Sequence, residues 1–280
     1  MSYKSILLHV DDHERCAARI ALALNIAAGF EAHLTALAMI QPLRIPQPAL
    51  AALGPQVEAQ QLEYARAQAN RALAVFNEQS RRAGYGSVET VADTGDALSA
   101  VTLHARYNDL VVIGQHNPDQ DVQQWPDASF FPELVSMTVG RPVLVVPYAG
   151  NFTKVGENVL IAWDASREAT RAVTDALPLL RRARRVIVMS VNPDKIARHG
   201  AEPGADIALF LARHGVKVES SPQHAGKLDV GSFLLSRVAD LDADLLVMGA
   251  YGHSRIRELV LGGVTQTILS SMTVPVLFSH

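Results

Sequence analysis

The chain has 280 residues, a length that fits two domains of similar size. Hydrophobic residues make up 49% and charged residues 19%, so the chain has enough apolar material for a core and is not disordered. A net charge of -3 excludes the basic excess of a dedicated nucleic-acid binder. The single cysteine, Cys16, cannot form an internal disulfide, which fits a reducing compartment. Without a signal peptide or a membrane-length apolar run, we expect a cytoplasmic protein that binds neither nucleic acid nor a membrane.

Two copies of one pattern follow each other along the chain. Residues 6–11 resemble 159–164, residues 109–114 resemble 244–249, Ser136-Met137-Thr138 recurs at 271–273, and residues 142–145 recur at 275–278. The first pair is 153 residues apart and the second 135, so the second copy has 18 fewer residues between them. We place this surplus at Gln41 to Gln61, where four prolines forbid a continuous helix and predict a loop. The boundary is predicted within 149–156, which gives domains of residues 1–150 and 151–280.

Short apolar runs alternate with helical periods in each copy. For the second copy we expect strands at 158–164, 185–191, 216–220, 244–249 and 274–279. The expected helices between them are one N-capped by Ser166 and ended or kinked by Pro178, one at 205–214, and one with an apolar face from Val230 to Leu241. A glycine-rich loop follows the fourth strand and leads to a last helix from about Gly263. Apolar strands separated by helices imply a parallel sheet covered on both faces. Each copy is therefore predicted to be a five-stranded, doubly wound α/β domain. Ligands bind such sheets beyond the carboxyl ends of the strands, here near Asp164, Val191 and Gly249.

A glycine-rich loop follows the fourth strand of the second copy. Gly249 and Gly252 are followed, after nine residues, by Gly262 and Gly263. Glycines allow an anion to approach the backbone N–H groups closely, and a helix that starts near Gly263 adds free donors and a partial positive charge. The loop between them also contains three basic residues, His253, Arg255 and Arg257. This arrangement predicts a site for a di- or triphosphate, while the alternative is that the glycines only make turns.

With this loop and its repeated pattern, the chain resembles a tandem member of the universal stress protein family. The spacing of Gly249, Gly252 and Gly262 matches the G-x2-G-x9-G motif of the ATP-binding members, and a Pro-Val-Leu strand follows. The resemblance implies two Rossmann-like domains of the HUP, or adenine nucleotide alpha hydrolase-like, type. It also implies ATP, with Mg²⁺, as the cofactor. The implied nucleotide-binding residues are Ala162, Asp164, Val191, Met248, Gly249, Gly252, His253, Arg255, Gly262, Gly263, Val264 and Thr265, with Asp164 at the nucleoside and the backbone near Val191 at adenine.

The sequence departs from the motif at one position. The family has Ser or Thr after the third glycine, and this chain has Gly263. One hydrogen bond to a charged group is worth roughly 1.5–3 kcal/mol, so its loss weakens binding without abolishing it. Thr265 either replaces that hydroxyl or bonds within its own helix.

The first copy is predicted to have lost the phosphate site. With the 135-residue offset extended through Thr138, Asn117, Asp127 and Ala128 stand where the second copy has Gly252, Gly262 and Gly263. Asp119 and Asp121 add further acids, and a carboxylate repels a phosphate. An alternative is that Asp11, Asp12 and these acids bind a cation.

Two functions compete. The first is an ATP-binding regulatory protein of the stress response, with the nucleotide in the second copy. The second is a nucleotide-independent protein-interaction module. No residue resembles a positioned general base, so we favour a binding protein over an enzyme, with at most slow ATP hydrolysis.

The resemblance also predicts how the copies assemble. Last strands pair across a two-fold axis in the family, so Pro142 to Val146 should meet Val274 to Ser279 and protect two sheet edges. The chain would then be an internal pseudo-dimer. Pairing of two such chains into a homo-oligomer and the identity of a protein partner are left open.

Overall fold

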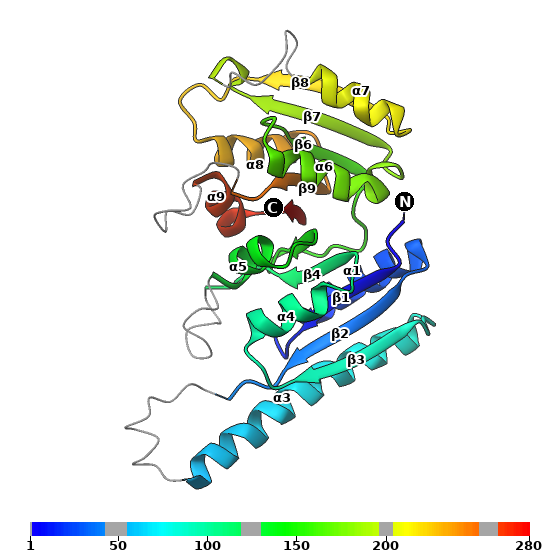
Figure 1. Cartoon of the computed structure of the whole chain (residues 1–280), viewed down its shortest axis with the longest axis vertical. Coiled ribbons are helices and arrows are strands. Elements are labelled where there is room, and N and C mark those ends of the chain that lie inside the picture. The colour runs from blue at the N-terminus through cyan, green and yellow to red at the C-terminus, as the bar shows by residue number, and fades with distance from the viewer. Residues whose placement is uncertain (1, 43–54, 119–129, 196–203, 252–262) are drawn as a thin grey trace.

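The computed structural model describes residues 2–42, 55–118, 130–195, 204–251 and 263–280. It is an α/β protein with a single ten-stranded sheet of order β3-β2-β1-β4-β5-β10-β9-β6-β7-β8 (Figure 1). All neighbouring strands are parallel except β5 and β10, which meet in the middle. The predicted pair of doubly wound domains is confirmed.

In the first half the described elements follow one another as β1 (Ser5–Val10), α1 (Cys16–Phe30), β2 (His33–Met39), α3 (Pro55–Arg82), β3 (Val88–Asp93), α4 (Ala97–Ala105), β4 (Leu110–Gly114), α5 (Phe131–Thr138) and β5 (Val143–Val146). Those of the second half are β6 (Asn158–Ala162), α6 (Arg167–Leu180), β7 (Arg185–Val191), the short 3₁₀ turn η3 (Pro193–Lys195), α7 (Ala205–Arg213), β8 (Val218–Gln223), α8 (Val230–Asp240), β9 (Leu245–Gly249), α9 (Gly263–Ser271) and β10 (Val276–Ser279).

The elements predicted for the second half are present with small shifts at their ends. Ser166 caps α6 as predicted, because its Oγ accepts a hydrogen bond from the N–H of Ala169 at 3.0 Å. Pro178 lies inside α6, two residues before its end, so it marks the terminus without preventing the last turn. The third strand begins at Val218, two residues later than expected.

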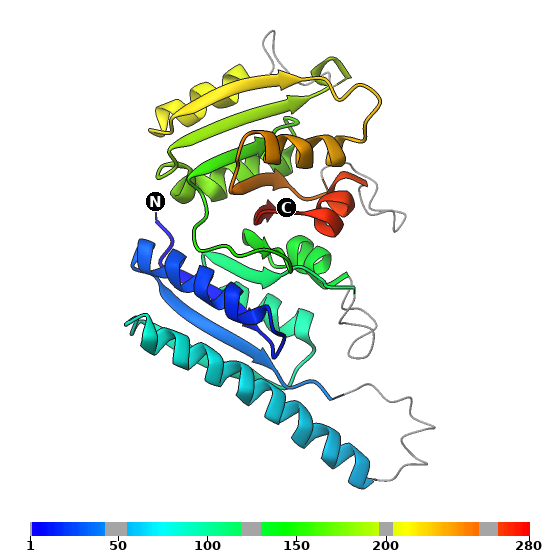
Figure 2. The ribbon, with the colours of Figure 1, turned by 180° about the vertical axis from the view of Figure 1, so that it is seen from behind.

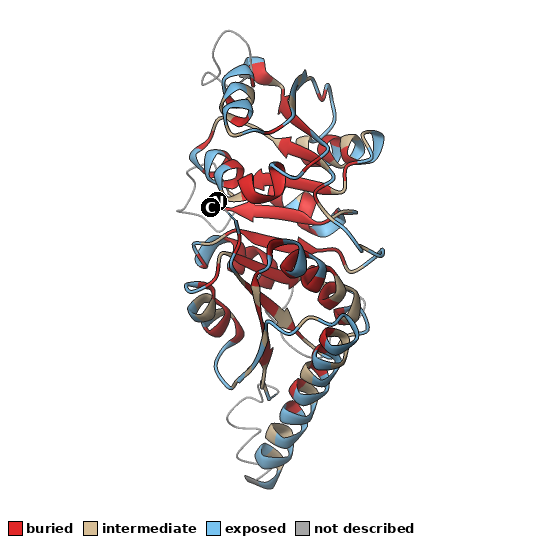
Figure 3. Ribbon diagram, turned by 90° about the vertical axis from the view of Figure 1, so that its right-hand side faces the viewer, coloured by how far each residue is buried: buried red, intermediate tan, exposed pale blue. Residues whose placement is uncertain are grey.

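Hydrophobic cores cover both faces of the sheet. One contains residues of α1, α3, α6 and α7, and the other contains residues of α4, α5, α8 and α9. Ile6, Leu7 and Leu8 of β1 are all completely buried although they alternate between the faces. Figure 3 shows the buried strands between helices whose outer surfaces are exposed. Among the described helices, none is long and apolar enough to cross a membrane.

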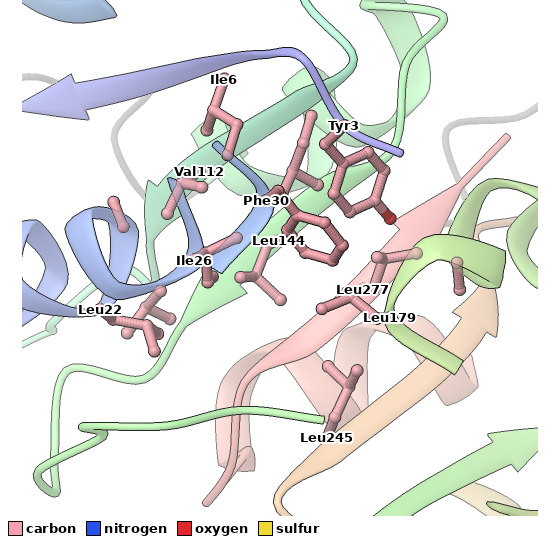
Figure 4. Packing of buried hydrophobic residues seen from close by; sticks show 14 of the residues in the cluster. Tyr3, Ile6, Leu22, Ile26, Phe30, Val112, Leu144, Leu179, Leu245 and Leu277 are labelled. Carbon is pink, nitrogen blue, oxygen red and sulfur yellow. The ribbon is translucent and has the colours of Figure 1, made fainter. Parts of the chain in front are cut away.

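The last strands of the two halves pair as predicted. Leu144 of β5 lies opposite Leu277 of β10 in an antiparallel ladder. Side chains on one face of this ladder join the halves further, where Tyr3 and Phe30 pack near Leu179 (Figure 4). The hydroxyl of Tyr3 donates to the carbonyl oxygen of Asp175 at 2.7 Å, and the guanidinium of Arg182 lies 3.9 Å from the ring centre of Phe30. The chain is an internal pseudo-dimer with one continuous sheet.

The predicted loop at Gln41 to Gln61 is partly wrong, because α3 begins at Pro55. Proline is tolerated in the first turn of a helix, where its missing N–H has no intrahelical partner. The remaining stretch, 43–54, lies outside the described residues. Much of the first half's extra length is helical, since α3 has 28 residues and its counterpart α7 has 9. Figure 2 shows α3 running past the edge of the sheet.

Candidate functional site

The strand ends singled out from the sequence lie together in the second half. β6 lies between β9 and β7, and all three run parallel. Their carboxyl ends, at Ala162, Gly249 and Val191, therefore lie at the same end of the strands. The chain leaves β6 for β7 on one side and later returns to β9 on the other. This reversal is the switch point at which doubly wound sheets bind ligands.

Asp164 lies in the turn between β6 and α6. Its Oδ1 accepts a hydrogen bond from the N–H of Ser166 at 3.0 Å, and Ala165 between them has a left-handed φ of 58°. The side chain is half-buried, and it forms no ion pair with any residue that the structure describes. Among the described residues, Oδ2 of this carboxylate has no hydrogen-bond partner and remains a free acceptor.

Gly249 has a structural reason to be glycine. A Cβ atom at this position would lie 2.6 Å from the backbone nitrogen of Ala169 and 2.6 Å from the carbonyl carbon of Glu168. The first turn of α6 therefore packs directly on the end of β9. Met248, one residue earlier, is buried on the opposite face among the residues of α8 and α9. The sequence did not reveal this contact, because it joins segments 80 residues apart.

α9 begins at Gly263, as predicted. A Cβ atom there would meet none of the described atoms within 4 Å. Val264 is half-buried and Thr265 is buried within the helix. Gly252, His253, Arg255, Arg257 and Gly262 lie outside the described residues, so the predicted phosphate loop is described only at its two ends.

The same place in the first half is filled by an ion pair. Arg19 of α1, which is 6% exposed, donates from Nη2 to Oδ2 of Asp11 at 2.6 Å and from Nε to the carbonyl oxygen of His9 at 3.0 Å. Burial is the largest influence on the Asp11 carboxyl and would raise its pKa. The charge and hydrogen bond of Arg19, with smaller contributions from His9 and His13, together outweigh it and hold that pKa below its usual range. Asp11 is therefore an ionised and occupied acceptor.

Two further side chains complete this cluster. Burial lowers the pKa of His9 to about 4, so the ring is neutral at pH 7. Burial raises the pKa of the Cys16 thiol to about 11, which agrees with the interpretation of Cys16 as a packing residue in α1.

The second half has alanine where the first has these larger side chains. At the 153-residue offset, Ala162, Ala169 and Ala172 correspond to His9, Cys16 and Arg19. Asp11 and Asp164 share a position in the fold but not an environment. Sequence analysis missed Arg19, and the same offset that paired the two aspartates was the signal that could have found it.

A cavity of about 420 Å³ lies above this cluster in the first half. Its lining includes His9, Asp11, Arg19, Gln68, Phe131 and Tyr148. The first half thus keeps a hollow at its own switch point, although its floor is occupied by the Arg19–Asp11 pair. The sequence predicted loss of the phosphate loop here and did not predict a cavity.

The predicted correspondence between the two phosphate loops needs correction. Leu144 and Leu277, at the centre of the β5–β10 ladder, are 133 residues apart, not 135. The last helices follow this offset, because Val139 and Met272 are both 5% exposed whereas Met137 is 36% exposed. The repeated Ser-Met-Thr therefore does not mark equivalent positions.

Gly263 consequently corresponds to Phe130, not to Ala128. Gly262 lies outside the described residues, as does the Asp127 predicted to match it. Pro132, in the first turn of α5, removes one of the N–H donors at the helix start. Asp119, Asp121 and Asp127 lie outside the described residues. Among the described residues, the argument against a triphosphate site in the first half rests on two. Phe130 stands where the second half has glycine, and Pro132 lacks an N–H donor.

Comparison with known proteins agrees with the architecture. The model of the universal stress protein family matches residues 2–125 and 156–280. Universal stress protein Slr1230 of Synechocystis is 28% identical over 231 residues, which cover 77% of this chain and 75% of that protein.

Two solved structures share the fold over nearly the whole chain. A universal stress protein of Archaeoglobus fulgidus has a TM-score of 0.72 at 16% identity, with 98% of this chain and 95% of that chain covered. Protein PA1789 of Pseudomonas aeruginosa, described as functionally unknown, has a TM-score of 0.62 at 17% identity, with 99% and 92% covered. Since the family model matches both halves, the chain belongs to the universal stress protein family, with two tandem copies of its fold.

Proposed function

We propose that this protein is a nucleotide-binding regulator of the stress response that holds ATP, with Mg²⁺, in its second half. The proposed site is the one inferred from the motif, running from Ala162 and Asp164 through Val191 and the end of β9 to the start of α9. The first half supplies the other side of the pseudo-dimer and has no triphosphate site.

One observation carries this proposal, namely the contrast between Asp164 and Asp11. Asp11 is bonded to Arg19 at 2.6 Å, whereas Ala172 stands at the position equivalent to Arg19 and cannot reach Asp164. A half-buried carboxylate with free lone pairs at a switch point suits the hydroxyl groups of a ribose, which are hydrogen-bond donors.

The start of α9 supports the phosphate end of the proposal. No described residue crowds the helix start at Gly263, and the N–H groups and partial positive charge of a helix start favour an anion. The hydroxyl that the family motif has at this position is missing, so we expect affinity to be lower than the full motif would give, by about tenfold.

A second candidate is an interaction module that does not bind nucleotide. The close packing of Gly249 on α6 favours it, because that glycine would be needed for the fold alone. Neither candidate requires catalysis. Asp164 lies at the nucleoside end and so is not placed to activate water for attack on a γ-phosphate.

Calorimetric titration with ATP and Mg²⁺ tests the proposal, after a denatured sample has been checked for co-purified nucleotide. One site per chain is expected, and Gly262→Val should abolish it with the circular dichroism spectrum unchanged. Two sites per chain would contradict the loss of the first site. No binding to a protein that releases no nucleotide would favour the interaction module.

A further inference from the structure

The helix α4 of the first half turns one narrow face to solvent. Along residues 96–106, all of which the structure describes, the exposed positions recur after three, four and three residues, so they lie in line on one side of the helix. These residues are Asp96, Ser99, Leu103 and Arg106, and we call them the α4 stripe. The stripe begins with an acid at the N-cap, ends with a base at the C-cap and has an exposed leucine between them.

The neighbouring helix α5 widens this exposed surface with further apolar side chains. The two helices lie side by side (Figure 1), and Oγ1 of Thr102 lies 3.4 Å from Oγ1 of Thr138. Their ends also meet, because Nη2 of Arg141 donates to the carbonyl oxygen of Arg106 at 2.9 Å. The large apolar residues exposed on these helices and directly after α4 include Leu103, Tyr107, Leu134 and Met137. Together with the α4 stripe they form what we call the α4–α5 face.

The second half has the same helices without this face. The N-caps of α4 and α8 are Asp96 and Asp229, which are separated by the 133 residues that also separate α5 from α9. At this offset Leu103, Tyr107, Leu134 and Met137 are replaced by Ser236, Asp240, Thr267 and Ser270, and Arg106 is replaced by Ala239. The fold therefore does not require apolar side chains at these positions. Exposed apolar surface that the fold does not require is typical of an interaction site.

The α4 stripe is complementary to itself when it is reversed. If a second α4 crosses the first in the antiparallel direction at the level of Val101, Asp96 comes opposite Arg106 of the other copy. In the same register Ser99 comes opposite Leu103, so a small side chain faces a large one. Two-fold symmetry forms each of these contacts twice. The reversed stripe thus brings opposite charges together at both ends and apolar contact in the middle.

We propose that two copies of this chain form a homodimer through the α4–α5 face, with α4 antiparallel to α4 of the second copy. The two α4 stripes form its centre, and Tyr107, Leu134 and Met137 extend the apolar contact around them. The second half cannot form the equivalent contact, because Ala239 has no charge to meet Asp229. Each chain therefore contributes one such face, and the dimer closes by its own symmetry without growing into a filament. This assembly does not depend on nucleotide.

Sedimentation equilibrium of the full chain measures the proposed dimer. The unaltered protein should have twice the monomer mass at micromolar concentration. Leu103→Ser introduces the residue that the second half has at this position, and it should raise the dissociation constant at least about tenfold with the circular dichroism spectrum unchanged. Leu209→Ser, the same change at an exposed position of α7, should leave the dissociation constant unaltered.

Charge reversal tests the antiparallel arrangement. Arg106→Glu and Asp96→Lys should each prevent dimerisation, because each places like charges opposite each other at both ends of the paired stripes. An equimolar mixture of the two variants should restore the dimer, since every introduced charge then meets its opposite. Asp96→Asn keeps a side chain that can cap α4 and should also weaken the dimer, which separates the effect of charge from that of the helix start. Arg213→Glu, at the exposed end of α7, is the control and should not change the mass.

Three results would overturn the inference. The first is an unaltered chain that remains monomeric at millimolar concentration. The second is a dimer that persists in both Leu103→Ser and Arg106→Glu, because its interface would then lie on another surface. The third is a mixture of the two charge-reversal variants that remains monomeric, because the helices would then not be antiparallel.

Discussion

Nη2 of Arg19 lies 2.6 Å from Oδ2 of Asp11, and the second half has no equivalent contact, because Ala172 occupies the position of Arg19. The two aspartates follow equivalent strands in equivalent folds. The side chain at this helix position, Arg19 in one half and Ala172 in the other, thus determines whether the aspartate already has a charged partner. This difference leads to two predictions, one for each half.

Ala172→Arg should block the proposed ribose position in the second half, because Arg19 pairs with Asp11 at the equivalent place in the first. The new guanidinium would extend from α6 toward Asp164, pair with its carboxylate and exclude a ribose. We expect ATP binding to fall at least about tenfold, measured by calorimetry with the fold checked by circular dichroism. Thr174→Arg, on the exposed side of the same helix, adds the same charge and should have little effect. Unchanged affinity in Ala172→Arg would show that Asp164 is not part of the site.

Arg19→Ala should destabilise the protein, because it leaves the partly buried Asp11 carboxylate without its charged partner. Breaking a fully buried ion pair costs about 3–5 kcal/mol of unfolding free energy, so the partial exposure of Asp11 sets the expected loss near the lower end of that range. Urea unfolding measures the loss, and adding Asp11→Ala should recover part of it. Arg171→Ala, which removes a half-exposed guanidinium from its pair with Asp175 and from its hydrogen bond to the Gly140 carbonyl oxygen, should cost at most about 1 kcal/mol. Equal losses at the two positions would contradict the view that the Arg19 pair is buried.

Stability should depend on pH through His9. Its pKa is about 4 in the folded protein and about 6.5 when unfolded, so between these values the unfolded chain binds more protons. The contribution of neutral His9 is complete above pH 6.5 and is lost as the pH falls toward 4, by up to about 3 kcal/mol. His9→Gln should flatten this part of the profile in urea unfolding, and His33→Gln, at a more exposed site on β2, should not. The same slope in His9→Gln would assign the dependence to other groups.

Gly263→Ser should strengthen ATP binding. The substitution restores the hydroxyl of the family motif at a position where an added Cβ meets no described atom within 4 Å. One hydrogen bond to a charged phosphate corresponds to a gain of about tenfold in affinity. Gly263→Ala is the matched control, since it adds the Cβ without the hydroxyl, and calorimetry should show no gain. A Ser variant that behaves like the Ala variant would place the phosphates away from α9.

The fold was predictable because its evidence is local. The buried parallel strands appear as apolar runs, and repetition of β1 as β6 and of β4 as β9 identified the two halves. The position of Arg19 against Asp11 was not predictable in the same way, because it depends on how α1 packs on β1.

The register of the last helix was mispredicted for a different reason. Ser-Met-Thr occurs in both halves, but the offset is 135 between β4 and β9 and 133 between α5 and α9. The first half therefore has two more residues between β4 and α5, and identical residues lie at different positions of the two helices. Only the burial of Val139 and Met272 and the strand register reveal the shift. Short identities are therefore weaker evidence than the strand pairing that follows them.

The second half alone, residues 151–280, should form a homodimer through β10. Its three apolar residues, Val276, Leu277 and Phe278, are completely buried in the full chain, and removal of β5 would expose them on an unpaired edge. Since Leu277 pairs with Leu144 at the centre of the natural ladder, two copies of β10 can pair in the same antiparallel register with Leu277 opposite Leu277. Sedimentation equilibrium at micromolar concentration should give twice the monomer mass. Leu277→Lys should prevent dimerisation, because it places like charges directly opposite each other. A folded monomer at millimolar concentration would contradict both the strand pairing as a driving force and the boundary at residue 150.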